Sequence, residues 1–116
     1  MGALADLQED IPPKRAAELV HEGAVQLVDV RETYEHEAGR IAGARHVELT
    51  RLTDEAGSID RDRPVLFYCR VGSRSAMATQ AFRAAGFDAY NLEGGLAAWA
   101  RAGLPLEPRG GVVADH

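Results

Sequence analysis

The sequence has one cysteine and no excess of basic residues. These two features limit the cellular compartment and the classes of binding partner that we expect. A lone cysteine, Cys69, cannot form an internal disulfide, so nothing indicates an oxidising compartment, and we predict a cytoplasmic location. The formal net charge of −5 argues against a surface that binds nucleic acid or an anionic membrane. Neither class of partner is therefore expected.

Long apolar runs and metal-ligand patterns are missing as well. The apolar runs are too short to cross a membrane, and the start MGALADLQEDIPP lacks the basic segment of a secretion signal. The four histidines are scattered and there is no second cysteine, so no metal and no cofactor are predicted. The length of 116 residues suits one domain, which we place at residues 8–106, between flexible termini at 1–7 and 107–116.

Strand-like and helix-like patterns alternate along this domain. Strands are predicted at 25–29, 44–48, 65–68 and 88–92, because each run is short and contains Val, Phe or Tyr. Helices are predicted at 12–23, from just after Cys69 to Gly86 and at 96–103, with a short helix or turn at 31–39 and a loop up to Pro64. The alternation predicts an α/β fold whose parallel sheet is covered by helices on both faces.

Three predicted strands end in residues that can carry chemistry. Asp29, Cys69 and Glu93 each stand at the carboxyl end of a strand. In open parallel sheets the ligand-binding crevice lies beyond these ends. We therefore expect side chains that are far apart in the sequence to meet there.

The segment 69-CRVGSR-74 has the composition of an anion-binding loop. A buried cysteine is often only a small apolar side chain, but Cys69 stands where a strand turns into a helix N-terminus. Backbone N–H groups in such a turn point inward, and with the helix dipole and two arginines they favour a thiolate. Gly72 suits a position in the turn that requires positive φ. The loop therefore predicts a reactive cysteine.

Four motifs together resemble the rhodanese-like sulfurtransferase family. The segment 69-CRVGSRS-75 resembles its active-site loop, and 27-LVDVRETYE-35 resembles its Asp-Val-Arg-Glu strand end. The segment 39-GRIAGARHV-47 is similar to Gly-His-Ile-Pro-Gly-Ala, and 93-EGGLAAW-99 to Gly-Gly-x-x-x-Trp. The resemblance covers residues 8–106 and implies a rhodanese fold, with a five-stranded parallel sheet flanked by helices on both faces.

The resemblance also implies an activity, that of a single-domain thiosulfate sulfurtransferase. Cys69 would take a sulfane sulfur from thiosulfate or a similar donor as a persulfide and pass it to cyanide or a thiol. Asp29 and Ser75 would support the loop, and its other residues would bind the donor: Arg70, Val71, Gly72, Ser73 and Arg74. The expected partners are small-molecule donors and acceptors, with a thiol protein or glutathione as further acceptors, and the expected state is a monomer.

The sequence departs from the family pattern outside the loop. Arg40 and Ala42 stand where His and Pro are usual, and Thr33 replaces a frequent Pro. We interpret these as tolerated variation. Arg31 and Glu35, four residues apart on a predicted short helix, are expected to form an ion pair.

Other interpretations remain open. A phosphatase or arsenate reductase places five residues between the cysteine and the arginine, whereas four separate Cys69 from Arg74, and Ser75 stands at the next position. A non-catalytic rhodanese module for binding or regulation typically lacks the cysteine, which this chain retains. The third alternative is a persulfide relay whose donor and acceptor are both proteins.

Overall fold

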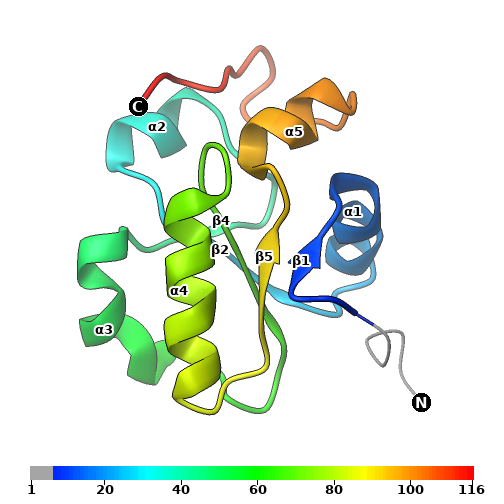
Figure 1. Ribbon diagram of the computed structural model, residues 1–116. Helices are drawn as coiled ribbons and strands as arrows, with labels where there is room; N and C mark the ends of the chain where they lie inside the picture. Colours follow the sequence, from blue (N-terminus) through cyan, green and yellow to red (C-terminus); the bar gives the residue numbers. More distant parts are fainter. Residues whose placement is uncertain (1–6) are drawn as a thin grey trace.

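A five-stranded parallel sheet, with strand order β1-β5-β4-β2-β3, forms the centre of the computed structural model, which describes residues 7–116 (Figure 1). This confirms the predicted α/β fold. The elements run in chain order as β1 (Asp10–Ile11), α1 (Pro13–His21), β2 (Gln26–Asp29), α2 (Thr33–Ala38), β3 (Arg45–His46), η1 (Leu49–Arg51), α3 (Leu52–Glu55), η2 (Ala56–Ser58), β4 (Val65–Tyr68), α4 (Ser73–Ala84), β5 (Ala89–Leu92) and α5 (Gly95–Arg101).

Alternate residues of β4 pack into two separate cores. Leu66 and Tyr68 belong to the core under α1 and α5, whereas Val65, Phe67 and Cys69 belong to the core under α4 and α3. Figure 1 shows these helix pairs on opposite faces of the sheet. Because every residue of β4 is buried, the strand is apolar throughout instead of alternating with polar residues.

Two features of the fold are absent from the sequence prediction. The first is β1, whose residues Asp10 and Ile11 pair with Asn91 and Leu92 of β5; two residues are too few to produce a period. The second is the series of short helices η1, α3 and η2, which occupies the predicted loop. Leu52 is buried there, but a single helical turn leaves no repeating pattern.

The segments predicted to be flexible lie at the two ends of the chain. The prediction for residues 1–7 falls, apart from Leu7, outside the described residues. In the other segment, Glu107 and Arg40 exchange backbone hydrogen bonds of 2.7 and 2.8 Å, and the Val112 N–H donates to the Ala38 carbonyl at 2.8 Å. The structure therefore places residues 107–112 beside the end of α2, and their mobility stays a prediction.

Within residues 7–116, none of the helices is both long enough and apolar enough to cross a membrane.

Candidate active site

The Cys69 sulfur lies at the end of β4, inside a group of hydrogen-bond donors. Its Sγ accepts from the Gly72 N–H at 3.1 Å, from the Ser75 N–H at 3.4 Å and from the Ser75 hydroxyl at 3.3 Å. Cys69, Gly72 and Ser75 are all buried. Hydrogen-bond donors that point at the sulfur favour a negative charge there, so this arrangement suits a thiolate or a persulfide anion. The reactive sulfur predicted from the sequence thus has an anion-stabilising environment.

The backbone of the loop has the left-handed turn that its glycine predicts. Gly72 has φ of 103° and is the N-cap of α4, so the chain turns there from β4 into the helix. Asn91 of β5 fixes this turn, because its Nδ2 donates to the Gly72 carbonyl at 3.2 Å and to the Asp10 Oδ1 at 3.0 Å. The neighbouring strands β1 and β5 therefore help to hold the cysteine loop.

The Gly94-Gly95 turn forms a second support behind the loop. The Leu96 N–H donates to the Cys69 carbonyl at 2.8 Å, and the Ala97 N–H donates to the Arg70 carbonyl at 2.9 Å. Gly95 has φ of 64°, and a Cβ at this position would lie 2.5 Å from the Arg70 carbonyl oxygen. The backbone of this turn therefore lies too close to the cysteine loop for a side chain at position 95.

Arg74 reaches across to α2 and pairs with a buried carboxylate. Its Nη1 and Nη2 donate to the two oxygens of Glu35 at 2.9 and 3.0 Å, and Glu35 Oε1 also accepts from the Glu32 N–H. Burial alone would raise the pKa of Glu35, but the hydrogen bonds from Arg74 and Glu32, with the charge of Arg74, outweigh it and hold this pKa below its usual value. The pairing raises the pKa of Arg74. The arginine is thereby fixed near the sulfur as a permanent positive charge.

The predicted Arg31–Glu35 ion pair is wrong. Arg31 precedes α2 instead of lying on it, so the four-residue spacing does not place the two side chains on one helix face. Arg31 instead donates from Nε and Nη2 to the two Asp29 oxygens at 2.9 and 2.7 Å. His36 Nδ1 also lies 2.8 Å from Asp29 Oδ2. Arg31, Asp29 and the imidazole thus form one network.

Asp29, predicted to support the loop, is the centre of that network. Its carboxylate is paired with Arg31 of the β2–α2 turn and with His36 of α2, and not with any of residues 69–75. Burial would raise the pKa of Asp29, but the hydrogen bonds and charge of Arg31 and the hydrogen bond from His36 lower it below its usual value. A supporting role for Asp29 would therefore act through α2, which also carries Glu35 and so positions Arg74.

The remaining loop residues lie at the outer surface. Val71 is 52% exposed and Ser73 is exposed, so neither side chain is enclosed with the sulfur. Arg70 extends outward and places Nη2 3.3 Å from Asp115 Oδ1, while its Nε is buried without a hydrogen-bond partner. Glu93, beyond β5, is also exposed. The sulfur is therefore surrounded by Gly72 and Ser75, with the side chains of Arg70, Val71 and Ser73 outside them.

Sequence reasoning missed two residues that shape the site. Asn91 is a polar residue within a buried strand, and that contrast is a signal which could have identified it. Glu35 carried no such signal, because a glutamate on a short polar helix resembles many solvent-exposed ones. Its buried environment exists only after α2 packs against the loop.

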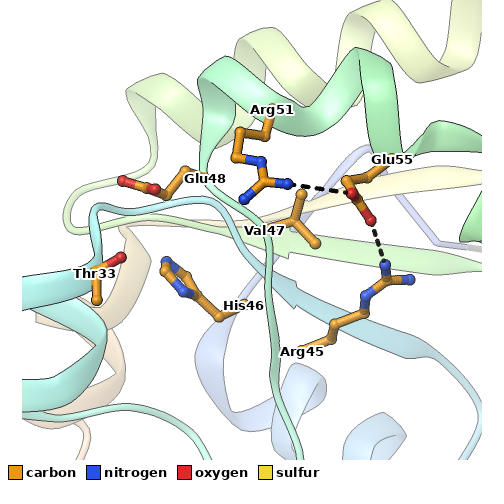
Figure 2. A pocket seen from close by; sticks show the side chains of 7 residues that line it. All are labelled: Thr33, Arg45, His46, Val47, Glu48, Arg51 and Glu55. Carbon is orange, nitrogen blue, oxygen red and sulfur yellow. Dashed lines mark hydrogen bonds and ion pairs between the residues drawn. The ribbon is translucent and has the colours of Figure 1, made fainter.

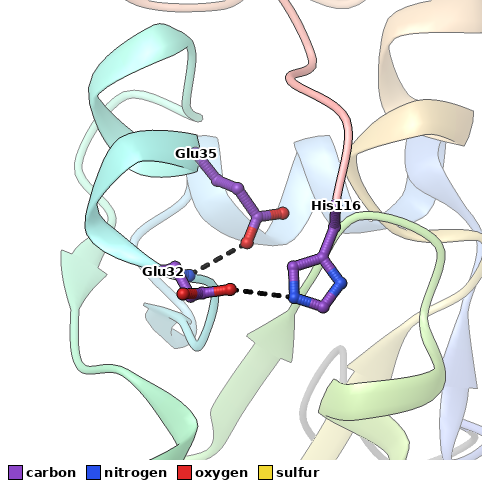
Figure 3. Close-up of side chains that lie close together, drawn as sticks. All are labelled: Glu32, Glu35 and His116. Atoms are coloured by element: carbon purple, nitrogen blue, oxygen red, sulfur yellow. Dashed lines mark hydrogen bonds and ion pairs between the residues drawn. The ribbon is translucent and has the colours of Figure 1, made fainter.

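One cluster within the described residues has the composition of a metal site. Ligand atoms of Glu32, Glu35 and His116 lie within 4.8 Å of one another, and Figure 3 shows His116 beside the two carboxylates. Both Glu35 oxygens already accept from Arg74, and His116 Nε2 is 3.0 Å from Glu32 Oε2. These contacts favour a network of ion pairs over metal ligation.

A polar hollow of about 310 Å³ lies beside β3 (Figure 2). Inside it, Arg45 and Arg51 both approach the Glu55 carboxylate, at 3.1 and 3.6 Å. The lining residues are Thr33, Arg45, His46, Val47, Glu48, Arg51 and Glu55. None of residues 69–75 is among them, so the hollow is separate from the sulfur.

A family model and the sequence relatives of this chain indicate the same protein family. The family model described as Rhodanese-like domain matches residues 12–102. An uncharacterized protein of Bacillus subtilis, YqhL, is 44% identical over 75 residues, which are 64% of this chain and 60% of the relative. The thiosulfate sulfurtransferase GlpE of Pseudomonas fluorescens is 39% identical over 98 residues, which are 84% of this chain and 88% of the relative.

A solved structure gives the same result. The crystal structure of a rhodanese-related protein from Thermoplasma volcanium superimposes with a TM-score of 0.80 at 27% identity, covering 85% of this chain and 97% of that one. The fold of this chain therefore agrees with that of its structural relative. The chain belongs to the rhodanese-like domain family.

Proposed function

We propose that the protein is a thiosulfate sulfurtransferase that carries a sulfane sulfur on Cys69 as a persulfide. The observation that carries this proposal is the set of donors around Sγ: two N–H groups and one hydroxyl, all from Gly72 and Ser75. Such donors stabilise a sulfur anion before and after the transfer. The relative GlpE, named a thiosulfate sulfurtransferase, supports thiosulfate as the donor.

The first half-reaction transfers sulfur to the protein. The Cys69 thiolate attacks the outer sulfur of thiosulfate, a new S–S bond forms, and the original S–S bond breaks as sulfite leaves with the electron pair. The persulfide anion on Cys69 then carries the negative charge. The N–H groups of Gly72 and Ser75 donate to Sγ, so they stabilise the attacking thiolate and are next to the sulfur that it accepts.

The second half-reaction returns the enzyme to its starting state. The carbon of cyanide, or the sulfur of a thiolate, attacks the outer persulfide sulfur, and the Cys69 thiolate leaves with the electron pair. No oxidant, reductant or cofactor is consumed in either step. A small thiol, glutathione and a thiol protein are all chemically competent acceptors.

The two arginines of the loop have different roles in this proposal. Arg74 is held by Glu35 and contributes a fixed positive charge near the sulfur. Arg70 is 35% exposed and binds the sulfonate end of the donor, since its guanidinium can pair with two oxygens at once. The charge of each arginine favours departure of sulfite. A cytoplasmic location and a monomeric state stay predictions.

The test is the intact mass of the protein after incubation with thiosulfate. We expect a gain of one sulfur atom that disappears when cyanide is added, with thiocyanate released in equal amount. The matched control is Cys69→Ser, which keeps a side chain of similar shape and should gain nothing. Because Cys69 is the only cysteine, the site of any added sulfur is unambiguous.

An unchanged mass in the wild-type protein would refute the proposal and favour a binding module. Hydrolysis of an aryl phosphate ester by the wild-type protein, absent from Cys69→Ser, would indicate phosphatase chemistry instead.

A further inference from the structure

Residues 107–116, here called the C-terminal segment, follow the surface of α2 towards the cysteine loop. The segment is attached first at Arg40, through the backbone exchange with Glu107, and then at Ala38, which accepts from the Val112 N–H at 2.8 Å. Gly39 lies directly under this segment, since a Cβ there would collide with the Val112 carbonyl oxygen. The path of the segment is thus set by backbone contacts before it reaches the site.

The last two residues of the segment make polar contacts at the rim of the site. The Tyr34 hydroxyl donates to the Asp115 carbonyl at 3.0 Å, and His116 pairs with Glu32 at 3.0 Å. The Asp115 carboxylate is 3.3 Å from Arg70 Nη2. Figure 1 shows this end of the chain beside α2, and Figure 3 shows His116 at the N-terminal end of that helix. The segment therefore brings a carboxylate onto the cysteine loop.

The two loop arginines differ in how easily another anion can displace the carboxylate that each one pairs with. Arg74 is paired through both terminal nitrogens with Glu35, whose side chain is fully buried. Arg70 is paired through one nitrogen with Asp115, whose side chain is fully exposed, and the Arg70 Nε is buried without an acceptor. An exposed, single-contact ion pair is weak, so another anion can displace it. Of the two arginines, Arg70 is therefore the one whose guanidinium group can bind an incoming anion.

We propose that Asp115 is a specificity-determining residue that competes with anionic sulfur donors for Arg70. This inference rests on the proposed function. The Asp115 carboxylate acts as an internal competitor, because a doubly charged donor must displace it before pairing with the Arg70 guanidinium. A donor without charge meets no such competition. The C-terminal segment therefore lowers the affinity for small dianions relative to neutral donors.

The test measures anion binding without sulfur transfer. The probe is inorganic sulfate, which has the shape and charge of thiosulfate but no sulfane sulfur, and the signal is the NMR shift of the Arg70 Nε–H. In Asp115→Asn we expect sulfate to bind about 1.5- to fivefold more tightly than in the wild type, the range of one exposed ion pair. The KM for thiosulfate should fall by a similar factor while kcat stays unchanged.

The matched control is Asp62→Asn, which removes the same charge from an exposed residue before β4, at the opposite end of that strand from the loop. Its sulfate affinity should equal that of the wild type. A second variant, Tyr34→Phe, keeps the carboxylate but removes the hydrogen bond that positions Asp115. It should tighten sulfate binding less than Asp115→Asn does.

Three outcomes would overturn the inference: no detectable effect of Asp115→Asn, an equal effect of Asp62→Asn, or no sulfate-dependent shift at Arg70. Failure of the proposed function can be distinguished from failure of this inference. If thiosulfate added no sulfur to Cys69 while sulfate binding tightened as expected, the competition at Arg70 would stand and only the sulfurtransferase activity would be lost.

Discussion

Two adjacent strands end in opposite kinds of buried polar site. The end of β2 carries Asp29 and Arg31, each fully buried, and the two side chains pair through two short hydrogen bonds. The end of β4 carries Cys69, also fully buried, whose sulfur accepts three hydrogen bonds from neutral donors. Tyr68 and Asp29 are register partners in the sheet, so the two sites are next to each other.

The difference between the two sites separates stability from chemistry. At the β2 end each charge is neutralised by the other, although Arg31 Nη1 is buried without a hydrogen-bond partner. At the β4 end the donors surround an atom that can gain or lose a negative charge. One site therefore stabilises the carboxyl end of β2, and the other is the one that reacts in the proposed mechanism. Substitutions at the two sites should divide accordingly between unfolding free energy and activity.

Removal of the nucleophile should have the largest effect, and only on activity. Cys69→Ser is expected to reduce sulfur transfer to cyanide by at least about a thousandfold, since hydroxyl oxygen is a far weaker nucleophile than thiolate. The free energy of unfolding should change by less than about 1.5 kcal/mol, because the volume is nearly conserved. Thiocyanate formation and urea denaturation measure the two quantities. Residual transfer near the wild-type rate would contradict the mechanism.

Asp29→Asn should mainly lower the free energy of unfolding, the reverse of the pattern expected for Cys69→Ser. The neutral amide leaves Arg31 buried without its counter-charge, and breaking a buried ion pair costs about 3–5 kcal/mol of unfolding free energy. Urea denaturation measures the loss, and Asp62→Asn serves as an exposed control with an expected change within about 0.5 kcal/mol. A cost for Asp29→Asn no larger than that of the control would remove the contrast between the two strand ends.

Glu35→Gln tests the element that connects the two sites. Glu35 belongs to α2, close to Asp29, but it pairs with Arg74 of the cysteine loop. The amide keeps one acceptor oxygen and loses the charge, so we expect a loss of about 2 kcal/mol of unfolding free energy. We also expect a higher KM for thiosulfate as Arg74 becomes mobile. A double-mutant cycle with Arg74→Gln isolates the pair, and additive effects would show that the pairing is irrelevant.

The pH dependence of stability gives a further test of the same carboxylates. The pKa values of Asp29 and Glu35 are lowered in the folded protein, so the unfolded chain binds protons first as the pH falls. Their contribution to stability is complete above the unfolded pKa values, about 3.9 and 4.3, and is lost as the pH falls through the lower folded values. In Glu35→Gln the free energy of unfolding should fall less steeply with decreasing pH below about 4.3. An unchanged slope would contradict this account.

Ser75→Ala should have the smallest effect of the series. It removes one of the three donors to the Cys69 sulfur and leaves the two N–H groups in place. A net hydrogen bond of about 1 kcal/mol corresponds to a decrease in kcat of about fivefold. Steady-state kinetics with thiosulfate and cyanide measure it. A decrease as large as that of Cys69→Ser would mean that the hydroxyl, and not the backbone, provides the main stabilisation.

Local patterns explain which parts of the fold were predictable. β2, β4 and β5 are short apolar runs, and α1 and α4 begin and end at residues that favour helix termini, so each can be recognised within its own stretch of chain. The two-residue strand β1 and the one-turn helix α3 have no such signal. They form because β1 pairs with β5 and because Leu52 of α3 packs into the core under α4.

The features of the candidate site also divide into those that the local sequence predicts and those that depend on packing. The sequence by itself indicated the candidate nucleophile and determined the glycine turn and the helix N-terminus, because Cys69, Gly72 and Ser75 are close neighbours whose positions follow from the path of one loop. Only the tertiary structure decided which carboxylate each arginine meets. Arg74 pairs with Glu35 across 39 residues, and Arg70 pairs with Asp115 across 45. Ion pairing depends on where packing directs long side chains and on which charges it buries, and no local spacing encodes either.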